Sequence, residues 1–178
     1  MKSMKVTYYV ASSLDGYIAK EDGDVSWLEE LNISMENAGY DEFYSTVDAL
    51  VMGRKTYEMI VSFGQWPYGD KPVWVCESSK ITPMDGSNLQ VGNTPEEVYQ
   101  AANKMNIKHL WLVGGGSLAS SFLENNLLTN ISLSLMPIIL GSGIKLFGDL
   151  PSPIKIKNEN YKSHESGMAQ LDYTIKKA

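Results

Sequence analysis

The segment 109–127, HLWLVGGGSLASSFLENNL, constrains the fold of this chain more than any other stretch. Its first part, 110–113, is a short apolar run that is typical of a strand buried on both faces. After the three glycines at 114–116, apolar residues recur at helical spacing: Leu118, Phe122, Leu123 and Leu127. The segment therefore predicts a buried strand that turns through glycine into a helix, with Ser117 as the helix N-cap.

A strand that enters a helix through glycines favours binding of an anion. The first N–H groups of a helix have no partner inside it, the helix dipole makes this end positive, and glycines let a ligand approach the backbone. The spacing of Gly114, Gly116 and Ala119 also fits the dinucleotide fingerprint, although 136–138 lacks the acidic residue that a standard Rossmann site needs there. We therefore expect a phosphate or pyrophosphate outside a standard Rossmann site. A tight turn without a ligand is the alternative.

Composition narrows the class of protein. A chain of 178 residues fits one domain over 1–178, and its net charge of -6 argues against nucleic acid as a partner. The single cysteine, Cys76, excludes an intrachain disulfide and lies in an apolar run that favours a buried, inert thiol. No apolar run reaches the ~18 residues of a membrane helix and no signal peptide is visible, so we expect a cytoplasmic protein without a membrane partner.

Strands and helices are predicted to alternate along the chain. Apolar or β-branched runs predict strands at 5–11, 48–53, 72–76, 88–91 and 130–139, the last interrupted by Pro137. Helical spacing or capping residues predict helices at 37–47, 54–60 and 93–105, and the glycines at 140–144 predict a flexible loop. Alternating apolar residues at 154–157 and 171–175 predict a half-exposed antiparallel hairpin. This order predicts an α/β fold with a mostly parallel sheet and the hairpin added at its end.

Three predicted strands end in elements that suit a ligand: Ala11-Ser12, Gly53-Arg54 and Val113-Gly114. In open α/β sheets ligands bind beyond the carboxyl ends of strands, so these elements are expected to share one crevice. An arginine at a helix start opposes the helix dipole, which an anion beside Arg54 would explain, whereas a solvated arginine is the alternative. Hydroxyls and a lysine at 78–80 follow another strand and suit either a phosphate or a plain polar turn.

The sequence contains no motif that is typical of nucleophilic catalysis or of metal binding. Neither His109 nor His164 has a motif partner, and no metal-ligand spacing is present, so no metal is expected. Asp15 is the one carboxylate expected near the crevice mouth and is the candidate catalytic residue, although it could instead shape the turn before Gly16. A site that binds a dinucleotide without a nucleophile or a metal suits hydride transfer.

Taken together, these residues resemble the dihydrofolate reductase-like fold, specifically the branch with the reductase domain of the bifunctional riboflavin-biosynthesis deaminase/reductase. The resemblance covers nearly the whole chain and rests on the segments 11–19, 48–57, 78–80, 113–118 and 137–143. It implies a three-layer αβα domain, a homodimer, and an NADPH-dependent reductase that acts by hydride transfer on a small molecule.

The resemblance also implies which residues hold the cofactor NADPH: Ala11, Ile18, Ala19, Gly53, Arg54, Lys55, Thr56, Ser78, Ser79, Lys80, Val113, Gly114, Gly115, Gly116, Ser117 and Leu118. Ser78 and Ser79 resemble serines near the adenosine 2′-phosphate, and the glycines resemble the turn under the pyrophosphate. The substrate pocket is expected to be lined by Trp27, Tyr40, Phe43 and Tyr44.

Two positions depart from the family pattern and leave the substrate open. Dihydrofolate reductases carry a carboxylate in the first helix, and its nearest equivalent here falls around Asn37, with Asp41 and Glu42 about one turn further on. Riboflavin-pathway reductases often carry a glutamate where this chain has Gly114. We expect a small heterocyclic or carbonyl-type substrate. A true pyrimidinone or pterin reductase, or a nucleotide-binding module without turnover, are the alternatives.

Overall fold

The computed structural model of the chain describes residues 3–34 and 38–176. Its elements follow in this order: β1 (Lys5–Ser12), β2 (Tyr17–Ala19), α1 (Ser26–Glu30), α2 (Tyr40–Thr46), β3 (Ala49–Gly53), α3 (Arg54–Ser62), β4 (Pro72–Cys76), β5 (Asn88–Gln90), α4 (Pro95–Lys104), β6 (His109–Gly114), α5 (Gly116–Glu124), β7 (Asn130–Leu135), β8 (Ile144–Lys145), β9 (Ile156–Ser163) and β10 (Ala169–Ile175). No helix among these residues is long and apolar enough to cross a membrane.

An eight-stranded sheet forms the middle layer, in the order β5-β4-β3-β6-β1-β7-β10-β9. In this order, the strands β5, β4, β3, β6, β1 and β7 each run parallel to their neighbours. The strand β10 instead pairs antiparallel with both β7 and β9. The structure therefore confirms the predicted α/β fold, with a mostly parallel sheet and a C-terminal antiparallel hairpin. The hairpin is more exposed than expected at its edge, because every residue of β9 is exposed.

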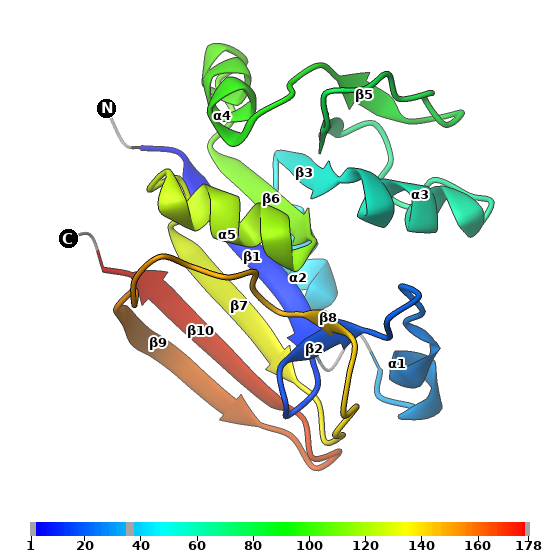
Figure 1. Cartoon of the computed structure of the whole chain (residues 1–178), viewed down its shortest axis with the longest axis vertical. Coiled ribbons are helices and arrows are strands. Elements are labelled where there is room, and N and C mark those ends of the chain that lie inside the picture. The colour runs from blue at the N-terminus through cyan, green and yellow to red at the C-terminus, as the bar shows by residue number, and fades with distance from the viewer. Residues whose placement is uncertain (1–2, 35–37, 177–178) are drawn as a thin grey trace.

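Helices cover both faces of the parallel strands, which explains why the central strands β3, β4 and β6 consist largely of apolar residues. On one face Val98 and Ala102 of α4 and Phe122 of α5 pack into the main core. On the other face Tyr57 and Ile60 of α3 pack into a second core, together with aromatic residues of α2. Figure 1 shows α5 lying across β6 and β1, with α2 behind the same strands. The three layers predicted from the resemblance are present.

The turn from β6 into α5 differs in detail from the prediction. The N-cap is Gly115 and the helix begins at Gly116, so Ser117 lies inside the first turn and does not cap the helix. The reason is close packing, because a Cβ on Gly116 would lie 2.2 Å from the Lys145 carbonyl oxygen. The peptide bond between Gly114 and Gly115 is cis.

A small second sheet corrects the expectation of a flexible loop at 140–144. Ile144 and Lys145 form β8, which pairs antiparallel with β2, a strand that the sequence patterns did not predict. Gly143 permits this pairing, because a Cβ there would lie 2.1 Å from the Ala19 carbonyl oxygen. The preceding strand β7 ends at Leu135, short of the predicted end, in keeping with the proline two positions on.

Two further expectations change at the ends of elements. The helix expected at 37–47 begins at Tyr40 in the structure, and its predicted start at Asn37 lies outside the described residues. Cys76, at the end of β4, is half-buried rather than buried. Burial nevertheless raises the pKa of its thiol to about 11, so the group stays protonated and unreactive at neutral pH, as predicted.

Candidate functional site

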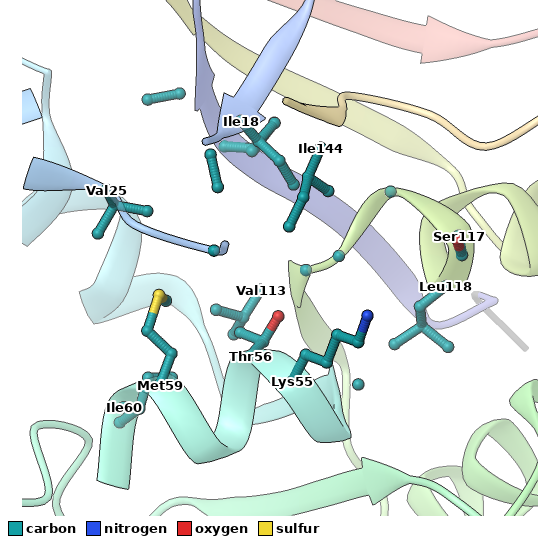
Figure 2. Close-up of a pocket in the computed structure, with 18 of the residues that line it drawn as sticks. Ile18, Val25, Lys55, Thr56, Met59, Ile60, Val113, Ser117, Leu118 and Ile144 are labelled. Carbon is teal, nitrogen blue, oxygen red and sulfur yellow. The ribbon is translucent and has the colours of Figure 1, made fainter. Parts of the chain in front are cut away.

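A cavity of about 1490 Å³ opens beyond the carboxyl ends of four neighbouring parallel strands, β3, β6, β1 and β7. Ala11, Gly53, Gly114 and Met136 lie at or just after these strand ends and line it. In Figure 2, Ile18 and Ile144 from β2 and β8 lie on one side of the opening, and α3 lies on the other. This is the place where open α/β sheets bind ligands.

Most of the predicted cofactor-binding residues line this one cavity: Ala11, Ile18, Ala19, Gly53, Arg54, Lys55, Thr56, Val113, Gly114, Gly115, Gly116, Ser117 and Leu118. Ser78, Ser79 and Lys80 are not among its lining residues. They lie beside it, where Arg54 Nη2 donates hydrogen bonds to Ser79 Oγ at 2.5 Å and to the Lys80 carbonyl oxygen at 3.2 Å. The structure thus brings the strand-end elements together, with 78–80 at the margin.

Two helices begin at the cavity without a side-chain cap. The N-caps of α3 and α5 are Gly53 and Gly115, and neither helix has an acidic residue in its first turn. By contrast, α4 is capped by Thr94, whose hydroxyl accepts from the Glu97 N–H, and it carries two glutamates in its first turn. The first N–H groups of α3 and α5 are therefore left for a ligand, and the dipoles of both helices favour an anion.

Glycine keeps the space in front of these helix starts open. A Cβ added to Gly53 would meet no atom closer than 3.9 Å, and one added to Gly115 only Thr56 Oγ1 at 4.0 Å. The backbone is thus accessible from the cavity. Lys55 adds a positive charge to the lining, and so does Lys145, whose ammonium lies 3.5 Å from the Asp149 carboxylate. These residues fit the pyrophosphate of a dinucleotide.

An ion-pair cluster lies at the β4 side of the cavity. The β3–β4 register pairs Gly53 with Cys76, so Arg54 and Glu77 follow neighbouring strand ends. Arg54 Nε lies 3.3 Å from Glu77 Oε2, and Arg54 Nη1 lies 3.1 Å from Glu58 Oε1. Sequence patterns did not single out Glu77, although its position after a strand beside Arg54 was the signal that could have found it.

Another part of the cavity, called its aromatic end below, is lined by aromatic side chains. Tyr9, Tyr40, Tyr68 and Trp111 line it, and the Trp111 ring meets those of Tyr40 and Tyr68 edge-on, at centroid distances of 5.9 and 5.5 Å. Burial raises the pKa of Tyr40 to about 12, so its hydroxyl is protonated at neutral pH. That hydroxyl has no hydrogen-bond partner among the residues that the structure describes. It is free to donate to a ligand.

Only Tyr40 of the four residues predicted for the substrate pocket lines the cavity. Trp27 is 1% exposed and packs in a separate core with Met136 and Met168. Phe43 stacks on Tyr9 at a centroid distance of 4.1 Å, and the Tyr44 hydroxyl donates to the Tyr68 carbonyl oxygen. The aromatic stripe of α2 therefore faces the sheet, and only its first member reaches the cavity.

Asp15 lies outside the cavity lining and binds a neighbouring loop. Its carboxylate accepts hydrogen bonds from the Ser13 hydroxyl at 2.6 Å and from the Leu140 and Gly141 N–H groups at 3.1 and 2.7 Å. The bond from Ser13 and those backbone donors lower the pKa of Asp15, so the group is ionised at neutral pH. These contacts give Asp15 a structural role, and within 3–34 and 38–176 no contact supports the predicted catalytic one.

Comparison with known proteins gives a family and a fold. A family model described as the RibD C-terminal domain matches residues 4–169. A candidate riboflavin biosynthesis protein from Shewanella sp. PV-4 is 31% identical, with a TM-score of 0.85 over 98% of this chain and 100% of that one.

Two more distant structures share the fold. A diaminohydroxyphosphoribosylaminopyrimidine deaminase/5-amino-6-(5-phosphoribosylamino)uracil reductase from Thermotoga maritima is 16% identical, with a TM-score of 0.73 over 97% of this chain and 57% of its own. Dihydrofolate reductase from Enterococcus faecalis, complexed with NADP(H), is 14% identical, with a TM-score of 0.67 over 97% of each chain. These comparisons confirm the dihydrofolate reductase-like fold that the resemblance implied.

Proposed function

The chain belongs to the family of the RibD C-terminal domain, and on that premise we propose that it is a reductase that uses a reduced nicotinamide dinucleotide. The resemblance to dihydrofolate reductase-like enzymes makes NADPH the first cofactor to test. One observation carries the proposal: two helices begin at the same cavity with glycine N-caps and without side-chain caps. When bound there, the dinucleotide supplies the hydride for the reaction.

The residues of the chain bind and orient the dinucleotide on this proposal. The N–H groups at the starts of α3 and α5 bind its pyrophosphate, and Gly53 and Gly115 leave room for it. Lys55 and Lys145 neutralise part of its charge. The apolar side chains of Ile18 and Val113 in the cavity lining keep water away from the reacting atoms.

The aromatic end of the cavity suits a small planar heterocycle as the substrate. Flat rings pack well against aromatic side chains, and the Tyr40 hydroxyl can donate a hydrogen bond to a ring carbonyl. Among the described lining residues, the cations are Arg54, Lys55 and Lys145. They belong to α3 and β8, on the part of the cavity proposed to bind the dinucleotide. We therefore propose an uncharged ring, of the pyrimidine type that the Thermotoga maritima relative is named for.

The proposal is tested by following NADPH absorbance while pyrimidinones, pterins and simple carbonyl compounds are offered in turn. We expect NADPH to bind in the absence of substrate and to be oxidised with a pyrimidine-type ring. Binding without oxidation across the whole panel would favour the nucleotide-binding module instead. A folded protein that binds no nicotinamide dinucleotide at millimolar concentration would refute the proposal.

A further inference from the structure

The turn after β4 has its anion-binding donors filled by an acidic side chain of its own. Glu77 Oε1 accepts hydrogen bonds from the Ser78 and Ser79 N–H groups at 2.8 and 3.2 Å, and from the Ser78 hydroxyl at 3.2 Å. Successive N–H groups that point to one spot form a binding place for an anion. In this chain the anion is a carboxylate from the same turn.

Arg54 is engaged by the same cluster. It contacts the carboxylates of Glu77 and Glu58, at 3.3 and 3.1 Å, and its remaining nitrogen donates to Ser79 and Lys80. The bonds from Ser79 and Ser78 lower the pKa of Glu77, so its carboxyl is fully ionised at neutral pH. Another anion placed at this turn would meet two carboxylates, with the Arg54 guanidinium and Lys80 of the same turn as the cations.

The sheet order indicates which part of a dinucleotide would reach this turn. Of the aromatic lining residues, Tyr9 lies on β1 and Trp111 on β6, whereas the glycines lie at the ends of β3 and β6. Glu77 follows β4, on the far side of β3. A dinucleotide with its pyrophosphate at the glycines and its nicotinamide at the aromatic end would therefore direct its adenosine ribose toward Glu77. NADPH and NADH differ only at that ribose, where NADPH carries a 2′-phosphate.

We propose, building on the proposed function, that Glu77 sets the cofactor preference by occupying the donors that a 2′-phosphate requires. NADPH must displace this carboxylate from the turn or tolerate its repulsion, which cancels part of the attraction to Arg54. The free ribose hydroxyl of NADH can instead donate a hydrogen bond to this carboxylate, and acidic residues accept such a bond in other NAD sites. The unmodified chain therefore discriminates little between the two cofactors, by about tenfold or less.

Calorimetric titration of NADPH and NADH into the unmodified protein, Glu77→Gln and Glu58→Gln tests this assignment. Glu77→Gln keeps the size of the side chain but replaces the charged acceptor with a neutral, weaker one that a phosphate displaces more easily, and we expect NADPH affinity to rise about tenfold or more. NADH affinity should stay the same or fall slightly. Glu58→Gln is the matched control, because it removes a carboxylate from the same arginine but none from the Ser78 and Ser79 donors. It should raise NADPH affinity by much less.

The outcomes separate this proposal from the one that it builds on. An equal gain in both variants would mean that only the net charge near Arg54 matters, and the role of Glu77 would be wrong. No gain in Glu77→Gln, or the same gain for NADPH and NADH, would also overturn it. If neither cofactor binds to any variant, while thermal unfolding shows that all are folded, then the proposed function fails and the role of Glu77 fails with it.

Discussion

Replacing Gly116 with alanine tests how α5 packs against β8. The added Cβ would lie 2.2 Å from the Lys145 carbonyl oxygen and 3.0 Å from that of Leu146. Both are backbone atoms that cannot rotate away, and β8 is held in turn by its pairing with β2. Overpacking lowers the free energy of unfolding by about 1–3 kcal/mol, and we expect a loss of about 3 kcal/mol here. For a chain of this size, that loss lowers Tm by about 6–12 °C.

Gly53→Ala is the matched control for this substitution. It introduces the same methyl group at the start of the other uncapped helix, where the nearest atoms would be 3.9 Å away. Its stability should stay within about 1 kcal/mol of the unmodified protein, while the methyl group narrows the cavity and weakens dinucleotide binding. Thermal and urea unfolding followed by circular dichroism measure both variants. If Gly116→Ala were as stable as Gly53→Ala, then the contact between α5 and β8 would not be as described.

Further predictions concern the substrate, the pH dependence and the assembly. Tyr40→Phe should raise KM for a pyrimidine-type substrate about two- to tenfold without changing dinucleotide affinity, and an unchanged KM would exclude a hydrogen bond from Tyr40. Dihydrofolate should be reduced slowly, because the sequence resemblance places the carboxylate position of dihydrofolate reductases around Asn37; a turnover of ~10 per second would contradict this. Burial lowers the pKa of His109 in the folded protein. As the pH falls, the unfolded chain therefore protonates this histidine at a higher pH than the folded chain does. The free energy of unfolding should therefore fall as the pH drops below about 6.5, and less so in His109→Gln, as urea titrations on either side of that pH would show. We propose a homodimer, and light scattering that gives the chain mass of 19.8 kDa would refute it.

The strand–glycine–helix elements could be predicted because their causes are local. A strand buried on both faces must be apolar throughout, and the glycines between strand and helix are visible in the sequence itself. The exact start of α5 was not predictable in this way. It depends on the approach of Lys145, which lies far along the chain and in a strand of only two residues.

The substrate end and the β4 turn were predicted less well because they depend on tertiary packing. A loop tryptophan such as Trp27 suits a pocket or a core equally well, and only the fold decides that it is buried with Met136 and Met168. A glutamate after a strand is ordinary in a sequence. The role of Glu77 emerges only once the turn directs its N–H groups at the carboxylate.

A crystal structure of the protein with NADPH tests the central claim most directly. We expect pyrophosphate oxygens within hydrogen-bonding distance of the N–H groups at the starts of α3 and α5, and the nicotinamide at the end of the cavity that Tyr40 and Trp111 line. A pyrophosphate bound away from both helix starts, or a nicotinamide outside the aromatic end, would contradict the account.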